Sequence, residues 1–166
     1  PKNALKMLDA ALNAVCAIDP ARAEAYRGNA AEYESEIEDI DARLTEIVNN
    51  GARNELIFAD RFPFLYLAHD YGISYKAAFN SCTAESEPSA QKMVELIQAI
   101  EKDHIPAVYT IEMSNGAIAR TLADETGVEI LNMHSMQTVT QQEFDAGETY
   151  LTLMRKNLDA IERGLN

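Results

Sequence analysis

Over the first third of the chain, apolar side chains recur three and four positions apart, which is the spacing of one helical face. This pattern predicts a helix over residues 3–18. A second helical pattern follows, for which Asp19 is the expected N-cap and Pro20 the first helical position. It continues to residue 49. We therefore expect a helical segment, 1–50, that contains one long helix.

Beyond residue 54, short apolar runs alternate with amphipathic stretches, a pattern typical of βα units around a parallel sheet. The apolar runs predict strands at 55–59, 73–79, 106–111 and 128–133. The stretches between them predict helices at 62–71, 87–103, 115–126 and 141–163, the last two ended by Gly127 and Gly164. The expected fold class is α/β, with a four-stranded parallel sheet flanked by helices and preceded by the long helix. Residues 51–166 would form this α/β domain.

The sequence has 27 acidic and 14 basic side chains, a net charge of -13. A face that binds nucleic acid needs clustered Lys and Arg, and no such run occurs here. No stretch reaches the roughly 20 apolar residues of a membrane helix. Cys16 and Cys82 are too few for a disulfide framework and lack the spacing of a zinc site. The chain opens on Pro1 without a secretory signal peptide, so we expect it to begin inside a larger gene product.

Polar side chains with metal-binding or acid–base chemistry follow the predicted strands. Ligands of open parallel sheets bind beyond the carboxyl ends of the strands, where the connecting loops converge. Asp60 follows the first strand, Glu112 the third and His134 the fourth. Two carboxylates and an imidazole are a normal ligand set for Mn²⁺ or Zn²⁺, so these three residues are the candidate cation site. The second strand is followed by a further polar group, made of Asn80, Cys82, Glu85 and Glu87.

Each candidate also has a structural interpretation. Polar residues at strand ends commonly cap helices or face solvent. Asp60 could form an ion pair with Arg61, and His134 could be a buried, hydrogen-bonded histidine without a ligand role. An enzyme on this fold would use Glu112 or Asp60 as a general base, but the sequence contains no GxGxxG, P-loop or GxSxG motif. We therefore predict that the chain is not an enzyme.

Four phrases of the sequence, taken together, are similar to one bacterial family. They are NALKMLDAALNAVCAIDPARAEAYRGNAAEYESEIEDID at 3–41, FLYLAHDYGI at 64–73, ESEPSAQKMVELIQAIEKDHIPAVYTIEM at 85–113 and AGETYLTLMRKNLDAIERGL at 146–165. The chain resembles the C-terminal half of the zinc- and manganese-specific solute-binding proteins of ABC importers, a group that includes streptococcal lipoprotein adhesins. The phrases cover nearly the whole chain in the expected order.

The resemblance implies two lobes joined by one long rigid helix, with Zn²⁺ or Mn²⁺ held between the lobes as the transported ligand. This chain would then hold the linking helix and the C-terminal lobe. The implied partners are an N-terminal lobe, which supplies two histidine ligands, and an ABC permease in the membrane. The implied location is outside the cytoplasm, either as a membrane-anchored lipoprotein or in the periplasm.

The resemblance also implies ligand positions within this chain. One ligand of the family lies about ten residues before a Tyr-Gly pair that Tyr71-Gly72 matches, and that position is Arg61, which cannot bind a cation. Its neighbour Asp60 is the expected replacement. The other ligand is an Asp after the last strand, for which His134 is the natural substitute. Glu112 matches a Glu of some members, for which no ligand role is implied.

Two alternatives stay open at this point. The chain could be an adhesin-like interaction module that binds no metal, an alternative that the Arg61 departure keeps open, or an α/β enzyme of the kind described above. As an isolated fragment, the chain would expose the apolar stripe of residues 1–50, and exposed apolar patches drive association. We therefore expect a tendency to form a homodimer through this segment.

Overall fold

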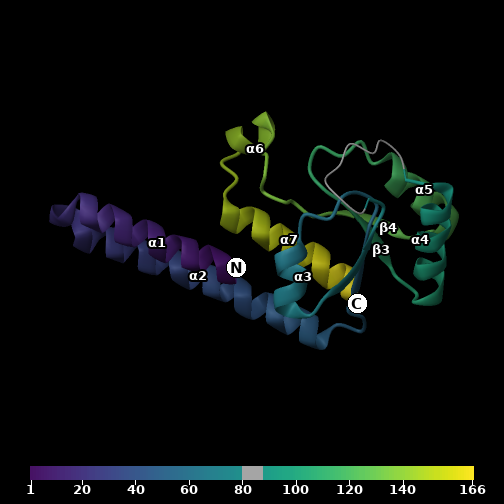
Figure 1. The fold of residues 1–166 in the computed structure, drawn as a ribbon, viewed down its shortest axis with the longest axis horizontal. Coiled ribbons are helices and arrows are strands. Elements are labelled where there is room, and N and C mark those ends of the chain that lie inside the picture. Colours follow the sequence, from purple (N-terminus) through teal and green to yellow (C-terminus); the bar gives the residue numbers. More distant parts are fainter. Residues whose placement is uncertain (80–87) are drawn as a thin grey trace. The chain divides into compact units, whose positions relative to one another are not determined.

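The computed structural model describes residues 1–79 and 88–166, which form two compact units, Pro1–Thr45 and Glu46–Asn166 (Figure 1). The elements are, in chain order, α1 (Lys2–Ile18), a 3₁₀ turn (Pro20–Arg22), α2 (Ala23–Asn50), β1 (Glu55–Phe58), α3 (Leu65–Tyr71), β2 (Ser74–Ala77), α4 (Ala90–Lys102), β3 (Ala107–Thr110), α5 (Ala117–Thr126), β4 (Glu129–Asn132), α6 (Gln141–Asp145) and α7 (Tyr150–Leu165). None of these helices combines the length and the apolar character needed to cross a membrane.

The first unit contains α1, the 3₁₀ turn and most of α2. Asp19 is the N-cap residue of the 3₁₀ turn and Pro20 its first residue, as predicted, but the Asp19 side chain accepts no capping hydrogen bond. Its Oδ2 instead accepts hydrogen bonds from Arg22 Nε at 2.6 Å and from Tyr26 Oη at 3.0 Å. The bond to Asp19 raises the pKa of Tyr26. Since the turn comes first, the long α-helix begins at Ala23 and not at Pro20.

A groove of about 340 Å³ separates α1 from α2 and is almost entirely apolar. It is lined by Leu8, Ala11, Leu12, Val15, Tyr26, Asn29, Ala30 and Tyr33. Apart from Asn29, these residues belong to the apolar positions whose spacing predicted the two helices. Self-association through residues 1–50 stays a prediction.

The second unit is built on a four-stranded sheet of order β2-β1-β3-β4, in which every neighbouring pair is parallel. Each strand lies within one of the predicted apolar runs, so the predicted fold class is confirmed. In the register of the sheet, Phe58 of β1 lies opposite Ala77 of β2 and Tyr109 of β3. Because all strands run in one direction, the segments that follow them start at the same edge of the sheet, which we call the carboxyl edge.

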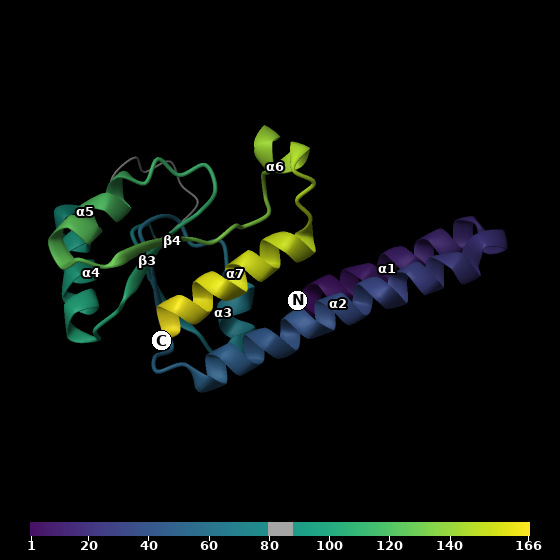
Figure 2. The same ribbon diagram turned by 180° about the vertical axis from the view of Figure 1, so that it is seen from behind.

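Helices cover both faces of the sheet: α4 and α5 lie on one face, and α3 and α7 on the other (Figures 1 and 2). Successive side chains of a strand point to opposite faces. Ile57 and Val108 accordingly pack in the core beneath α4 and α5. The next residues along each strand, Phe58 and Tyr109, stack with ring centroids 5.1 Å apart, and Tyr109 Oη donates a hydrogen bond to the carbonyl oxygen of Ala160 in α7.

Two glycines mark where the helix prediction was wrong. The single helix predicted over 141–163 is two helices, α6 and α7, and Gly147 lies between them with a φ of 73°, which favours glycine. Gly164 does not end α7, which continues to Leu165. A Cβ at Gly164 would lie 1.8 Å from Tyr109 Oη, so the glycine is explained by packing and not by helix termination.

Other helix ends shift by a few residues. α3 begins at Leu65, three residues later than predicted. The N-cap of α4 is Ser89, whose Oγ accepts a hydrogen bond from Lys92 N, while the predicted start at Glu87 lies outside the described residues. Gly127 ends α5 as predicted, with a φ of 74°. These shifts leave the strands, and therefore the carboxyl edge, where the sequence placed them.

Candidate functional site

The three candidate ligands lie just beyond the carboxyl edge, Asp60 after β1, Glu112 after β3 and His134 after β4. They do not form a joint ligand set within this chain. Across residues 1–79 and 88–166, no group of three or more His, Cys, Asp or Glu side chains could hold a metal ion. The described residues therefore do not by themselves supply three such ligands for a cation at this edge.

Glu112 uses its carboxylate to connect two loops. Its Oε2 accepts a hydrogen bond from Ser135 N at 2.7 Å, and its Oε1 accepts one from Ser135 Oγ. Both oxygens are thus taken by a residue that follows β4, so the loop after β3 is fastened to the loop after β4. This contact is the structural alternative for Glu112, a polar group that holds neighbouring loops together.

His134 is buried, with 4% of its surface exposed, and its ring has a partner on the Nδ1 side. Nδ1 accepts a hydrogen bond from Met136 N at 2.9 Å. Nε2 has no hydrogen bond within the described part of the chain, but Glu143 Oε1 lies 3.5 Å from it. That distance is too long for a good hydrogen bond and short enough for electrostatic attraction.

The main chain of His134 is held by Asn157, a residue of α7 that is 1% exposed. Asn157 Oδ1 accepts from His134 N at 2.7 Å, and Asn157 Nδ2 donates to His134 O at 2.8 Å. One amide side chain therefore satisfies both polar backbone groups of a buried residue. An asparagine among the apolar positions of the last helix was a signal of such a role that the sequence analysis did not use.

Glu143 is the second residue that the sequence analysis missed. It lies at the N3 position of α6, where Thr140 is the N-cap, and the two form a reciprocal capping box. Glu143 Oε2 accepts from Thr140 N at 2.7 Å, and the Thr140 backbone and hydroxyl hold the pKa of Glu143 below its ordinary value, with His134 adding to the effect. The spacing Thr-x-x-Glu is the sequence signal of this box.

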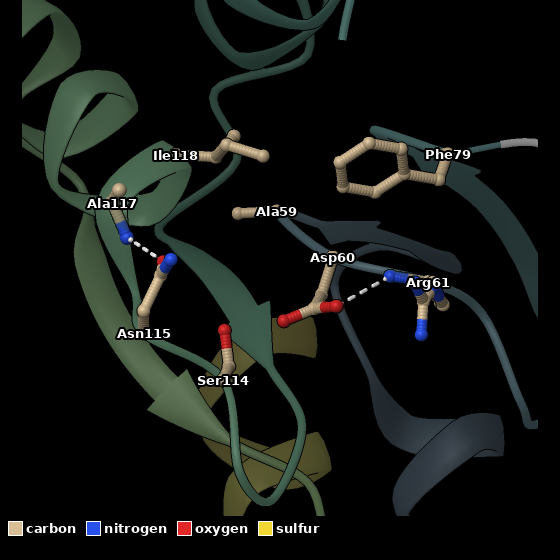
Figure 3. A pocket seen from close by; sticks show the side chains of 8 residues that line it. All are labelled: Ala59, Asp60, Arg61, Phe79, Ser114, Asn115, Ala117 and Ile118. Atoms are coloured by element: carbon tan, nitrogen blue, oxygen red, sulfur yellow. Dashed lines mark hydrogen bonds between the residues drawn. The ribbon is translucent and has the colours of Figure 1, made fainter. Parts of the chain in front are cut away.

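Asp60 lines a cavity of about 220 Å³ at the carboxyl edge (Figure 3). Its Oδ1 accepts a hydrogen bond from Arg61 N at 2.8 Å. Its other oxygen has no hydrogen-bond partner among the residues that the structure describes. The contact between the two residues runs through the Arg61 backbone, and no ion pair joins their side chains. Within the described part of the chain, Asp60 therefore lines a cavity and keeps one carboxylate oxygen without a hydrogen-bond partner, whereas both oxygens of Glu112 accept from Ser135.

The opposite wall of this cavity is formed by the segment between β3 and α5. Ser114 and Asn115 line it on the side across from Asp60, with the Asn115 side chain turned toward Ala117 (Figure 3). Ser114 Oγ accepts a hydrogen bond from Gly116 N, and Asn115 Oδ1 accepts one from Ala117 N at 2.9 Å. The Ser114 hydroxyl and the Asn115 amide group are therefore positioned by the start of α5. The polar lining of the cavity is the Asp60 carboxylate, the neutral groups of Ser114 and Asn115, and Arg61. A carboxylate beside neutral polar groups suits a hydrated cation, whereas the charge of Arg61 opposes one.

Other side chains capable of binding a metal lie elsewhere. His69 is in α3 with its side chain 86% exposed. Cys16 is a free thiol in α1 that donates to Ala23 O. The polar group after β2, Asn80 with Cys82, Glu85 and Glu87, falls outside the described residues.

The family model ZnuA, described as zinc-uptake complex component A, periplasmic, matches residues 1–164. The chain belongs to this family. The resemblance seen in the sequence phrases is thereby confirmed, and the ZnuA family is one of uptake-complex components and not of enzymes.

Individual relatives agree with the family assignment. The zinc-binding lipoprotein AdcA of Streptococcus pneumoniae is 29% identical over 163 residues, which are 98% of this chain and 32% of that protein. The zinc-binding protein AdcA of Streptococcus pyogenes is 32% identical over 142 residues, 86% of this chain and 27% of that protein. The chain therefore spans about a third of the length of these curated relatives.

A solved structure gives the same result for the fold. The Zn(II)-bound ZnuA-like domain of Streptococcus pneumoniae AdcA matches with a TM-score of 0.81 and 28% identity, over 99% of this chain and 61% of that one. The fold described here therefore corresponds to part of a two-lobed binding protein.

Proposed function

We propose that this chain is the C-terminal part of the metal-binding component of an ABC importer that takes up zinc. The observation that carries the proposal is the family match over residues 1–164. Two relatives, 29% and 32% identical to the chain, are described as zinc-binding and support it. Because the chain spans about a third of those relatives, the rest of the binding site would come from a part of the protein not present here, the N-terminal lobe.

Asp60 is the residue of this chain that we assign to the cation. It lines a cavity, and one of its carboxylate oxygens has no hydrogen-bond partner among residues 1–79 and 88–166, while both oxygens of Glu112 are used by Ser135. Zn²⁺ accepts carboxylate oxygens together with imidazole nitrogens in one ligand shell. One carboxylate from this chain and two histidines from the N-terminal lobe, as the family resemblance implies, would leave room for a further ligand or water.

The mechanism is capture and release without chemistry on the ion. Binding would favour a closed arrangement of the lobes, and a membrane permease would recognise the loaded protein because the ion shifts the balance between open and closed states. The histidine ligands must be neutral to coordinate, so the affinity should fall in acid. The protein would work outside the cytoplasm, as a lipoprotein on the membrane or in the periplasm.

Zinc is favoured over manganese because the two relatives are described as zinc-binding. A manganese-bound periplasmic protein from Candidatus Liberibacter asiaticus also matches, but at 23% identity it supports the fold alone. A carboxylate ligand suits both ions, since oxygen donors are accepted by Mn²⁺ as well as by Zn²⁺. Zinc is therefore the proposed ion, with manganese as the competitor in the titration.

The test is calorimetric titration of the full-length gene product with Zn²⁺ and with Mn²⁺. We expect tight binding of Zn²⁺ and at least a tenfold loss of affinity in Asp60→Asn. Asp124→Asn, on the exposed side of α5, removes the same charge away from the cavity and should bind like the wild type. Absence of binding for both ions would reject the proposal in favour of an interaction module. Equal affinities for Asp60→Asn and Asp124→Asn would reject the assignment of Asp60.

A further inference from the structure

We propose that His134 is a positioning residue of the carboxyl edge and not a metal ligand. The structure gives its buried ring a neighbour at each nitrogen: Met136 N donates a hydrogen bond to Nδ1, and the Glu143 carboxylate lies 3.5 Å from Nε2. The inference rests on the proposed function, in that it concerns which residues take part in the metal site. It departs from the family resemblance, which makes His134 the natural substitute for a ligand.

The proton positions of the ring follow from the donor on its Nδ1 side. A backbone N–H can only donate, so the 2.9 Å contact with Met136 N requires a bare Nδ1 that offers its lone pair. A neutral imidazole carries one proton, which is then on Nε2. An anionic group lies near that nitrogen, since Glu143 Oε1 is 3.5 Å away, although the two atoms do not form a hydrogen bond.

This arrangement leaves the ring without a lone pair for a cation. A metal ion on Nε2 normally requires the proton to be on Nδ1, where a neighbouring acceptor holds it. Here Nδ1 faces a donor, so a metal on Nε2 would demand either an imidazolate or the loss of the Met136 contact. A metal on Nδ1 would have to displace the Met136 N–H itself. The ring is 4% exposed, so neither change can be compensated by water.

The ring instead holds a turn in place. The contact from a side chain to the backbone N–H two residues later imitates an Asx turn, and Met136 at its end has a φ of 64°, unusual for a side-chain-bearing residue. Asn157 clamps the peptide groups on either side of His134. On the Nε2 side, the ring faces Glu143, which also caps α6. His134 therefore connects β4, the turn after it and the start of α6.

The proton arrangement can be read directly by nuclear magnetic resonance. Two-bond ¹H–¹⁵N spectra of the full-length protein, labelled at histidine, distinguish a bare ring nitrogen from a protonated one, and His134→Asn identifies the His134 signals by their loss. We expect a bare Nδ1 and a protonated Nε2, unchanged when Zn²⁺ is added to saturation. A metal-dependent shift of Nε2 or loss of its proton on addition of Zn²⁺ would overturn the proposal.

Variants separate positioning from coordination. His134→Asn can still accept from Met136 N, whereas His134→Ala cannot, so we expect His134→Ala to lower the Tm by about 3 °C and His134→Asn to recover part of that loss. His69→Asn, at an exposed position of α3, is the matched control and should leave the Tm unchanged. Equal Tm values for His134→Ala and His69→Asn would contradict the positioning role.

X-ray absorption at the zinc edge counts the imidazole ligands on the bound ion. We expect the same number in the wild type and in His134→Asn, and one fewer in the variant would show that His134 is a ligand. If the wild type binds no Zn²⁺, the proposed function fails on that result. The ring protonation and the Tm values still decide whether His134 holds the turn.

Discussion

Gly164 of α7 packs directly against the phenol of Tyr109, and Gly164→Ala tests how closely this helix fits the sheet. A Cβ at Gly164 would lie 1.8 Å from Tyr109 Oη and 2.8 Å from its Cζ, closer than van der Waals contact allows. Tyr109 is completely buried and donates a hydrogen bond to Ala160 O at 3.1 Å. Burial raises the pKa of Tyr109, so the phenol stays protonated and can donate. The added methyl group must therefore displace the phenol, the helix or both.

The expected loss of stability combines three contributions. Overpacking a well-filled core costs about 1 to 3 kcal/mol. Moving the phenol away from Ala160 costs about 1 kcal/mol more, the net value of a hydrogen bond. Alanine gains back about 1 kcal/mol over glycine within a helix. The free energy of unfolding should therefore fall by about 2 kcal/mol.

Urea unfolding followed by circular dichroism measures this change. Gly28→Ala in α2 is the matched control, since nothing lies within 4 Å of a Cβ there, and it should stabilise the protein slightly. In a Tyr109→Phe background the clash with Oη is gone, so Gly164→Ala should cost clearly less. A Gly164→Ala protein as stable as the wild type, or equally destabilised in both backgrounds, would refute the reasoning.

Three further predictions concern the carboxyl edge. Asn157→Ala leaves the buried N–H and C=O groups of His134 without partners, and thermal unfolding should show a loss of about 3 kcal/mol; a loss below about 1 kcal/mol would contradict the clamp. The pKa of Glu143 is lowered in the folded protein because Thr140 donates hydrogen bonds to its carboxylate. The stabilising contribution of Glu143 is therefore complete above the unfolded-state pKa of 4.5, and it is lost as the pH falls from there through the lower pKa of the folded state. Acid titration of stability should accordingly show a shallower decline in Glu143→Gln than in the wild type, and parallel curves would argue against this linkage. Arg61→Gln should tighten Zn²⁺ binding at low ionic strength by no more than about tenfold in a calorimetric titration.

The strands and most helices could be predicted because their signal is local. Ile57 and Phe58 are both 0% exposed, so β1 appears in the sequence as an unbroken apolar run, as expected of a parallel strand covered on both faces. The break near Gly147 escaped prediction because the amphipathic spacing continues on both sides of it. Gly164 was taken for a helix end because the reason for a glycine there, the phenol of Tyr109, is 55 positions away in sequence and visible only in three dimensions.

The site was predictable in position but not in chemistry. The parallel sheet placed Asp60, Glu112 and His134 at one edge, as the order of strands and loops suggested. Their partners depend on contacts across the sheet. Ser135 reaches the Glu112 carboxylate only because β3 and β4 pair in a particular register, and Met136 reaches His134 only because the turn takes an unusual conformation. Residue type and spacing alone do not reveal such contacts.

Arg61 stands where the family resemblance expects a ligand, and its charge is the strongest argument against a cation beside Asp60. The size of that effect can be bounded. Two unit charges roughly 6 Å apart in water interact by about 0.7 kcal/mol, so a guanidinium opposing a divalent ion costs about 1.4 kcal/mol, or about tenfold in affinity. Arg61 is exposed and contacts Asp60 through its backbone, so its side chain can turn toward solvent, and salt screens the remainder. Arg61 can thus weaken a site at Asp60 without abolishing it. A gain in Arg61→Gln far above tenfold, with Arg27→Gln unchanged, would instead mean that the guanidinium itself occupies the cation position.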